Sequence, residues 1–394
     1  MIDVLIVGAG PAGNNAALEL AGRGFSVSVI DRRQVIGDKL CTGIVGAECL
    51  RQFPADPSII YRSGRSATVY SPSGETLRVE RAEAQAYIVN RVAYVASFAE
   101  KAKKAGAEYL LGHEVRSLTV EAGSVTALIA NGTGPHPVTA KAAIIAGGFG
   151  SRLTRMAGLG QVGDYLIGAQ VEVEAAGLSE VEVYLGRTVA PGSFAWLVPT
   201  KEGRALLGLI ARRKTGQLLE TLIARLTQDG KIGTVTSPAK RWGIPIRPLK
   251  QAYRDRLLVI GDAAGQVKPA TGGGIYYGLQ TSALAAETLA TALSGGNLSA
   301  NALAPYERAW RALLGEELDT AYGARRIFEM LGDRQIDYLV RMMSSNGLAS
   351  RIFDRPDSSF DWHGGIARQV LRLPGVQGTI RLVSAVGRLA SQPA

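Results

Sequence analysis

The chain has 394 residues and a formal net charge of +10, and its composition excludes several classes of protein. Hydrophobic residues make up 46% and charged residues 20%, which rules out a disordered chain and allows two or three domains with sizeable cores. Apolar runs stay short of the roughly 18 residues that a membrane-spanning helix needs. With two cysteines and three scattered histidines, we expect no disulfide framework, no metal site and a reducing, cytoplasmic compartment.

The first predicted element is a strand at residues 4–7, which runs directly into a glycine-rich turn. The turn, residues 8–13, reads Gly-Ala-Gly-Pro-Ala-Gly and opens a predicted helix. In a dinucleotide-binding turn, the first glycine makes the bend, the second lets the backbone approach the pyrophosphate, and the third lets the helix pack on the strand. Asp31 closes the next apolar run, 27–30, at the offset of about 20 residues expected of the carboxylate that binds a ribose hydroxyl. The segment therefore predicts a dinucleotide site.

The next part of the chain mixes strands with one helix. A loop at 32–46 precedes a predicted hairpin, whose Pro-Ser-Gly turn joins two alternating runs at 67–71 and 76–79. Helical periodicity over 90–105 ends at Gly106. Further strands are expected at 108–111, 115–121, 125–130 and 142–146. The last of these is an apolar run typical of a buried parallel strand, so Gly147 at its end should return the chain to the cofactor.

Residues 151–250 have the pattern of an antiparallel sheet with one helix at 217–226. The strand candidates are 167–173, 181–185, 194–199 and 205–210. The chain then returns to the first domain through an apolar run at 257–260, and a long helix at 274–293 follows. Residues 302–394 are predicted to be helical.

Together with the Gly-Asp-Ala-Ala-Gly segment at 261–265, which favours FAD as the dinucleotide, these elements predict an α/β protein. It would have a Rossmann-type FAD-binding domain with an inserted antiparallel β-sheet substrate domain and a helical C-terminal region. The expected FAD-binding domain is discontinuous and comprises 1–60, 86–150 and 251–300. The expected substrate domain comprises 61–85 and 151–250, and the helical region comprises 301–394.

The choice of FAD rests on a second segment, Gly-Asp-Ala-Ala-Gly at 261–265, followed by Gly-Gly-Gly-Ile at 272–275. In known flavoproteins an aspartate in such a segment binds the ribityl–phosphate arm, so Asp262 is expected to do so here; the alternative is an N-cap for the next helix. The glycines would let the backbone lie against the isoalloxazine edge. A helix beginning near Ile275 would then direct its positive end at the flavin, where negative charge develops on reduction.

Four stretches resemble the geranylgeranyl reductase family, within the group of flavoproteins built like para-hydroxybenzoate hydroxylase. They are 8–13, Leu-Cys-Thr-Gly at 40–43, Gly-Ser-Phe-Ala-Trp-Leu-Val-Pro at 192–199, and 261–275. The resemblance covers roughly residues 1–300. It implies bound FAD and reduction of isolated carbon–carbon double bonds in long isoprenoid chains. One departure is Phe149-Gly150, where the wider group often has Asp-Gly; this counts against a monooxygenase and leaves the electron donor open.

The resemblance also assigns residues. Cys41 would supply or relay a proton to the alkene, or it is a cysteine that only packs. Phe194 and Trp196, two apart on a strand, would form an apolar wall before the flavin, or they belong to the sheet's core. The expected cofactor contacts are Gly8, Gly10, Ala12, Gly13, Asp31, Arg32, Arg91, Val115, Gly147, Asp262, Gly273, Gly274 and Ile275.

Besides Asp262, two of these cofactor contacts have an alternative role. Arg91 matches the family's arginine near the adenylate and pyrophosphate, but it could be a surface arginine. Arg32 would stack over the adenine or remain solvated. Val115 would approach the adenine with its backbone.

The implied partners are an isoprenoid or prenyl-lipid substrate and a reductant, either NAD(P)H or a ferredoxin-like protein, because no second complete Gly-x-Gly-x-x-Gly occurs. Two other functions stay open. A monooxygenase or halogenase is possible because Phe-x-Trp-x-Val-Pro is similar to the halogenase Trp-x-Trp-x-Ile-Pro segment. A flavin-containing lipid-binding protein without activity is the other.

The positive charge does not indicate nucleic-acid binding, because the basic residues are mostly scattered and no nucleic-acid motif occurs. The C-terminus is the exception, since no acidic residue follows Asp361. On a helix, one apolar face would comprise Leu382, Val383, Val386, Leu389 and Ala390. Arg381 and Arg388 would flank it, which is typical of an amphipathic helix at an anionic membrane surface; the same face could also dock on the body of the protein.

Overall fold

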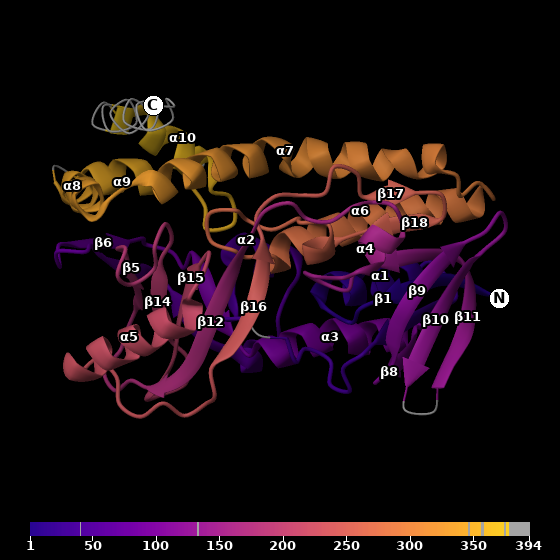
Figure 1. The fold of residues 1–394 in the computed structure, drawn as a ribbon, viewed down its shortest axis with the longest axis horizontal. Coiled ribbons are helices and arrows are strands. Elements are labelled where there is room, and N and C mark those ends of the chain that lie inside the picture. The colour runs from indigo at the N-terminus through magenta and orange to yellow at the C-terminus, as the bar shows by residue number, and fades with distance from the viewer. Residues whose placement is uncertain (40, 132–133, 346, 356–357, 374–375, 378–394) are drawn as a thin grey trace, which may run out of the picture.

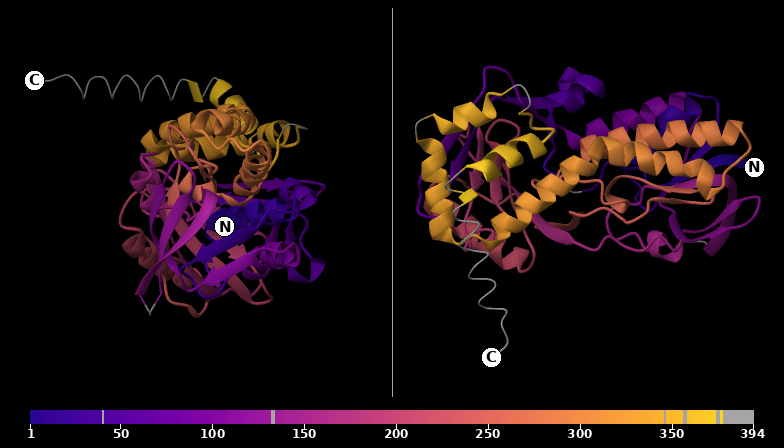
Figure 2. Two further views of the ribbon diagram at one scale, coloured as in Figure 1. Left: turned by 90° about the vertical axis from the view of Figure 1, so that its right-hand side faces the viewer. Right: turned by 90° about the horizontal axis from the view of Figure 1, so that it is seen from above.

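The computed structural model describes residues 1–39, 41–131, 134–345, 347–355, 358–373 and 376–377. Two large sheets lie at opposite ends of an elongated molecule, and helix α7 (Ala300–Met330) runs along both of them (Figure 1). Seen from above, α7 and the helices after it form a layer over one side of the molecule (Figure 2). A site placed between the two sheets is therefore also close to the C-terminal helices.

The first sheet has a parallel core. Its strands follow the order β17-β18-β11-β1-β2-β8, in which only the edge pair β17–β18 is antiparallel. The bounds are β1 Ile2–Val7, β2 Val27–Asp31, β8 Glu108–Leu111, β11 Gly134–Ile145, β17 Tyr253–Arg254 and β18 Leu257–Val259. Both faces of the parallel core are covered, so its strands read as continuous apolar runs. That is why β1, β2 and β18 could be predicted within a residue or two.

Three helices cover this sheet: α1 (Pro11–Ala21), α3 (Arg91–Lys104) and α6 (Ile275–Ser294). The side chain of Asn90 accepts a hydrogen bond from the backbone N–H of Ala93 and so caps α3. The predicted helices at 90–105 and 274–293 are confirmed.

Strand β11 is longer than the predicted strand at 142–146. Its first half pairs antiparallel with β10 (Val125–Asn131), which pairs in turn with β9 (Glu114–Val120), and its second half lies parallel to β1. Only the second half is buried on both faces, so only that half gave an apolar run.

The second sheet has the order β16-β12-β15-β14-β13-β5-β6. The bounds are β5 Ser66–Tyr70, β6 Thr76–Glu80, β12 Tyr165–Glu174, β13 Val181–Tyr184, β14 Ala195–Pro199, β15 Arg204–Ala211 and β16 Lys240–Pro245. It is antiparallel as predicted, except that β13 and β5 are parallel. Helix α5 (Thr215–Gln228) packs its apolar side on this sheet. The edge strand β16 was not predicted.

A third, small sheet was also missed. Strand β7 (Ala86–Val89) lies between β3 (Ile44–Gly46) and β4 (Ile60–Gly64). Strand β3 lies within the predicted loop at 32–46, because three residues are too few to show an alternating pattern. Short elements around it are α2 (Ala47–Gln52) and the 3-10 turn η1 (Pro57–Ile59).

The C-terminal region is helical in its described part, as predicted. After α7 come α8 (Asp333–Ser344), α9 (Leu348–Phe353) and α10 (Gly364–Arg372). Short helical segments elsewhere are α4 (Leu153–Met156) and η2 (Gly261–Ala263). The predicted amphipathic helix around 381–390 lies outside the described residues. Within those residues, every helix is too short or too polar to span a membrane.

Candidate functional site

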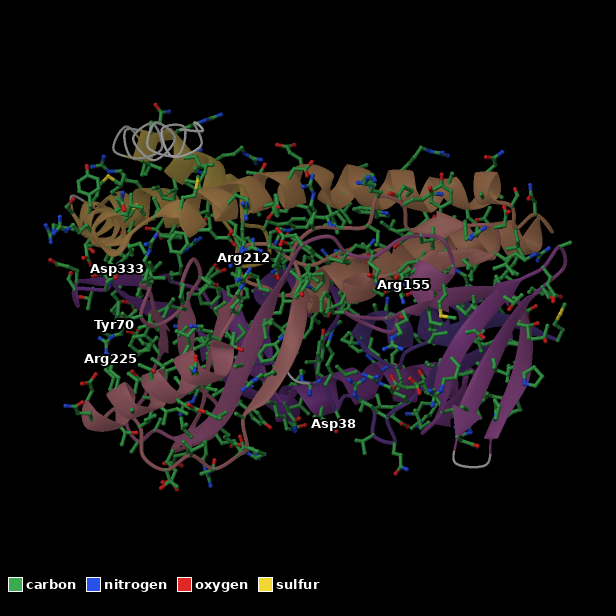
Figure 3. The ribbon with its side chains drawn as sticks, in the orientation of Figure 1. Asp38, Tyr70, Arg155, Arg212, Arg225 and Asp333 are labelled. Atoms are coloured by element: carbon green, nitrogen blue, oxygen red, sulfur yellow. The ribbon has the colours of Figure 1, made fainter. Side chains whose placement is uncertain are left out.

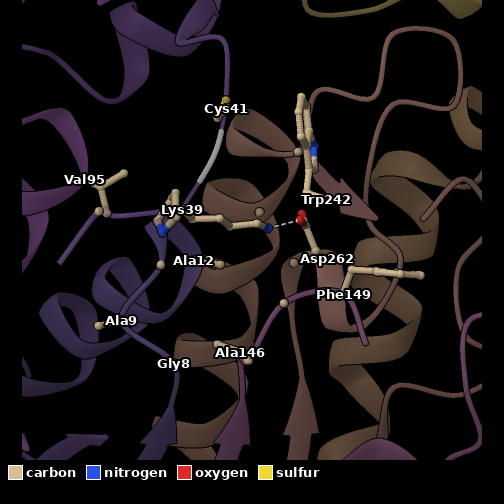
Figure 4. A pocket seen from close by; sticks show the side chains of 18 of the residues that line it. Gly8, Ala9, Ala12, Lys39, Cys41, Val95, Ala146, Phe149, Trp242 and Asp262 are labelled. Carbon is tan, nitrogen blue, oxygen red and sulfur yellow. Dashed lines mark hydrogen bonds and ion pairs between the residues drawn. The ribbon is translucent and has the colours of Figure 1, made fainter. Parts of the chain in front are cut away.

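A cavity of about 640 Å³ lies where the parallel strands of the first sheet end, on the side that faces the second sheet (Figure 4). This is the usual ligand position in open α/β sheets. Segments from distant parts of the chain meet there, and residues of each line the cavity: Gly8, Asp31, Cys41, Arg91, Trp242 and Asp262. The volume is in the range of a site for a large organic cofactor.

The glycine-rich turn has the geometry that its sequence predicts. Gly8 has a φ of +114°, and a Cβ on it would overlap the carbonyl oxygen of Ala146. A Cβ on Gly13 would overlap the carbonyl oxygen of Gly8, so this third glycine packs α1 on the strand instead of lining the cavity. The second glycine, Gly10, lines the cavity with no described atom within 4 Å of its would-be Cβ. The turn thus leaves an open path for a phosphate to reach backbone N–H groups.

Asp31 is fixed at the end of β2. Its carboxylate accepts backbone hydrogen bonds from Ala9 and Arg33, both at 2.8 Å. Each carboxylate oxygen can accept a further bond, so Asp31 can still receive a ribose hydroxyl at the cavity that it lines.

Asp262 extends into the cavity from η2 and forms an ion pair with Lys39 across it (Figure 4). It does not cap α6, because Gly274 occupies the N-cap position and no described side chain caps it. The backbone at Gly274 approaches Asp262 closely, and a Cβ there would come 2.5 Å from Oδ1. Gly274 and Ile275 line the cavity at the N-terminus of α6, where partial positive charge gathers; Gly273 is not among the lining residues.

A second hollow, about 480 Å³ in volume, continues from the first and shares Gly8 and Asp31 with it. Of the other predicted cofactor residues, Arg32 and Gly147 line both hollows, and Val115 lines the second alone. Arg91 instead lines the first cavity, at the start of α3. Burial lowers the pKa of the Arg91 guanidinium, which nonetheless remains a cation suited to a phosphate group. The two hollows together provide room for an extended dinucleotide.

The two cysteines occupy different surroundings. Cys41 lines the cavity, and its Sγ accepts a hydrogen bond from the backbone of Gly43 at 3.5 Å. The adjacent Thr42 donates to the side-chain oxygen of Gln170 on β12 at 3.0 Å, which attaches this segment to the second sheet. Cys49 is buried in α2, and burial raises the pKa of its thiol to about 12. Of the two cysteines, Cys41 is therefore the one that lines the cavity.

The aromatic pair predicted to face the flavin lies beside the cavity instead. The rings of Phe194 and Trp196 are 5.9 Å apart in one apolar cluster, but neither is among the described residues that line the cavity. Trp242, 6.4 Å from Trp196, and Ile244 line it instead. Neither Trp242 nor Ile244 was predicted as a site residue, because the strand that carries them, β16, was not predicted.

Glycines on neighbouring strands set the positions of these indoles. Trp242 pairs across β16 and β12 with Gly168, and a Cβ on Gly168 would lie 2.7 Å from the indole. Trp196 likewise pairs with Gly208 on β15, where a Cβ would overlap its ring. Each ring therefore lies over a glycine of the next strand.

Phe149 stands at the position where the wider group of flavoproteins often has an aspartate. Its ring lines the cavity, packs 5.0 Å from Tyr165 and occupies the space that a Cβ on Gly243 would need. The position therefore contributes apolar surface between the two sheets.

A charged network joins α7 to the second sheet. Arg212, labelled in Figure 3, donates to Asp164 at 2.7 Å and to Glu329 of α7 at 2.9 Å. Arg325 of α7 donates to the carbonyl oxygens of Pro269 and Gly192, both at 3.3 Å. Burial lowers the pKa of Arg325 to about 10. The network connects α7 both to the loop before α6 and to the segment before β14.

Comparison with known proteins agrees with this geometry. The family described as FAD binding domain matches residues 1–45 and 65–315. A digeranylgeranylglycerophospholipid reductase of Methanothermobacter thermautotrophicus is 31% identical over 362 residues, covering 88% of this chain and 93% of the relative.

Two solved structures show the same fold. A geranylgeranyl bacteriochlorophyll reductase-like protein from Thermoplasma acidophilum has a TM-score of 0.85 at 24% identity, over 97% of this chain and 99% of the other. A flavin-dependent brominase has a TM-score of 0.70 at 17% identity, over 99% of both chains. At these identities they support the fold alone.

Four features of the cavity fit FAD: an open glycine turn, an acid at the end of β2, Asp262 in the second segment and the N-terminus of α6. The family match covers most of the chain, and the relative matches nearly its whole length. The chain belongs to the geranylgeranyl reductase family of FAD-dependent oxidoreductases.

Proposed function

We propose that this protein saturates carbon–carbon double bonds in the long isoprenoid chains of a geranylgeranyl-type lipid. The observation that carries the proposal is the composition of the cavity. One side is built for FAD, the other presents apolar side chains of the second sheet, Trp242 and Ile244, and Cys41 lines the same cavity. The name of the relative from Methanothermobacter supports a lipid with geranylgeranyl chains as the substrate class.

Saturating one double bond adds a hydride to one carbon and a proton to the other. Bound FAD, once reduced, supplies the hydride. The N-terminus of α6 then stabilises negative charge at the cofactor site, because Gly274 and Ile275 line the cavity at the end of the helix where partial positive charge gathers. Trp242 and Phe149 exclude water from an apolar chain beside the reacting centre.

The Cys41 thiol is the proposed proton source. When its S–H bond breaks, the proton goes to the substrate carbon and the thiolate later regains a proton from water. The hydrogen bond from the Gly43 backbone to Sγ would stabilise that thiolate. Thr42, bonded to Gln170, keeps the cysteine close to the second sheet.

The electron donor is proposed to be NAD(P)H or a ferredoxin-like protein. We further propose that the protein works in the cytoplasm at the membrane surface, where lipids with isoprenoid chains are located. Its net charge of +10 supports attraction to anionic lipid headgroups.

An anaerobic half-reaction tests the proposal. The flavin is first reduced chemically, the donor is removed, and a digeranylgeranylglycerol phospholipid in detergent is added. We expect the reduced flavin to be reoxidised without oxygen, whereas the same lipid with saturated chains leaves it reduced. Reoxidation that requires oxygen would favour a monooxygenase or halogenase. No reoxidation by any alkene would favour a flavin-containing lipid-binding protein.

A further inference from the structure

Lys268 and Asp361 form an ion pair that is almost completely buried. The Nζ and Oδ1 atoms are 3.1 Å apart, and the side chains are 4% and 1% exposed. Lys268 lies in the loop between η2 and α6, the loop that brings Gly272 and Gly274 to the cavity. Asp361 comes from the C-terminal region, beyond residue 315, where the match to the FAD binding domain family ends.

Asp361 also holds a second segment. Its Oδ2 accepts backbone hydrogen bonds from Glu48 and Cys49 at the start of α2, both at 3.1 Å. The carboxylate lies so close to Gly46 that a Cβ on this glycine would overlap it. Helix α2 directly follows β3, and β3 follows the segment of Cys41. One carboxylate thus joins the loop before α6 to the segment that carries the candidate proton donor.

The neighbours of Asp361 in the chain form hydrogen bonds with Lys268, α2 and α7. The carbonyl oxygen of Phe360 accepts a second hydrogen bond from Lys268, at 3.0 Å. Trp362 donates to Glu48 at 2.8 Å. Glu317 of α7 accepts from the backbone of His363 and Gly364, at 2.6 and 2.7 Å. Residues 360–364 therefore fill the space between α2, α7 and the loop before α6.

A buried ion pair is a poor source of stability, because removing two charges from water offsets their attraction. Removing one partner is nevertheless costly, since the other charge is left uncompensated. The value of such a pair lies in fixing the geometry of the groups that it joins. Here those groups are two segments that both line the FAD cavity or lead directly to it.

We propose that Asp361 is a positioning residue of the FAD site: it holds the loop of Lys268 and the segment of Cys41 and α2 in register, so that the site is complete only when residues 360–364 are docked. The C-terminal region is then part of the cofactor site, although the FAD-binding motifs all lie before residue 276. The proposal rests on FAD binding and is independent of which lipid is reduced.

The test compares Asp361→Asn with Glu182→Gln. Glu182 pairs with Lys231 at 2.7 Å in the second sheet and contacts neither segment; its neighbour Tyr70 is labelled in Figure 3. FAD affinity is measured by titrating apoprotein with FAD, and backbone hydrogen exchange is measured on the same apoprotein. In Asp361→Asn we expect FAD to bind at least about tenfold more weakly and exchange to increase at both 44–53 and 264–274. Glu182→Gln should change neither.

A double variant distinguishes the positioning role of Asp361 from a general loss of protein stability. Replacing both charges by apolar residues, K268M with D361L, removes the uncompensated charge and should restore much of the melting temperature that Asp361→Asn loses. The backbone N–H groups of Glu48 and Cys49 still lack their acceptor, so we expect FAD affinity to stay weak and exchange at both segments to stay fast.

Glu317→Gln weakens the hydrogen bonds that attach residues 363 and 364 to α7. We expect it to lower FAD affinity and to speed exchange at both segments, by less than Asp361→Asn does. If Asp361→Asn does not fold, the double variant and Glu317→Gln decide the question. Wild-type FAD affinity in a folded double variant would overturn the proposal, as would exchange that increases in only one of the two segments.

Discussion

The two walls of the cavity are built in different ways. The wall toward the first sheet comes from two contiguous segments, 8–13 and 261–275, in which neighbouring residues determine the turn and the helix start. The wall toward the second sheet depends on register, because Trp242 lies over Gly168, a residue of another strand. The cofactor side is thus specified locally, while the substrate side is specified by pairing between distant residues.

The largest effect is expected where the two walls meet, at Cys41. Cys41→Ser should slow oxidation of the reduced flavin by the alkene about 10²–10⁴-fold, the usual contribution of a general acid. Serine keeps the size of the side chain but is a much weaker acid. Stopped-flow absorbance under anaerobic conditions measures this rate. Flavin reduction by an artificial donor serves as the control and should be unchanged.

A wild-type rate in Cys41→Ser would make Cys41 a packing residue, with the proton coming from water. Alkylation gives an independent check. Iodoacetamide at pH 8 should modify Cys41 before Cys49, because burial raises the pKa of the Cys49 thiol to about 12 and keeps it protonated. Mass spectrometry of peptides reads out the two sites.

Breaking the locally specified wall should have the next largest effect. In Gly13→Ala, the new Cβ would overlap the carbonyl oxygen of Gly8, so α1 must move away from β1. Overpacking of this kind costs about 1–3 kcal/mol, and we expect FAD affinity to fall by up to about 100-fold. FAD retained after gel filtration, compared with Gly323→Ala in the exposed part of α7, measures the loss. Full occupancy in Gly13→Ala would contradict the packing role of this glycine.

Asp262→Ala tests the second segment of the same wall. It removes a charged acceptor from the cavity and leaves Lys39 without its partner. A hydrogen bond to a charged group contributes about 1.5–3 kcal/mol, which corresponds to roughly a 10–100-fold weaker FAD complex. Asp38→Ala is the matched control, since Asp38 is an exposed acid that lines the same cavity. An equal loss of FAD affinity in the two variants would show that FAD binding depends on the negative charge alone and not on the position of Asp262.

The smallest effect is expected in the wall specified by register. Trp242→Ala should raise the KM for a long-chain lipid by about three- to tenfold, because one aromatic contact contributes about 0.5–1.5 kcal/mol. The FAD affinity should be unchanged. Trp196→Ala should alter KM less, since Trp196 is 5% exposed and does not line the described cavity. A larger effect at Trp196 would restore the sequence-based prediction that Trp196 and Phe194 face the flavin.

The difference between local specification and pairing of distant residues also explains what could be predicted from the sequence. The Gly8 turn, Asp31, Asp262 and the start of α6 were found because each depends on residues within a few positions. Strand β16 was missed because its six residues, bounded by Lys240 and Pro245, resemble a loop until they pair with β12.

The other features that were not predicted depend on contacts between residues far apart in the sequence. The parallel pairing of β5 with β13 joins segments more than 100 residues apart and leaves no local signal. The contacts of Lys39 and Asp361 are of the same kind, since each pairs with a residue that no motif connects to it.

Product analysis tests the central claim most directly. Enzyme with reduced flavin is mixed with a digeranylgeranylglycerol phospholipid without oxygen, and the extracted lipid is analysed by mass spectrometry. We expect the lipid to gain two hydrogens for each double bond saturated, in proportion to the flavin oxidised. An unchanged lipid, or a product that appears only with oxygen and carries an added oxygen or halogen atom, would contradict it.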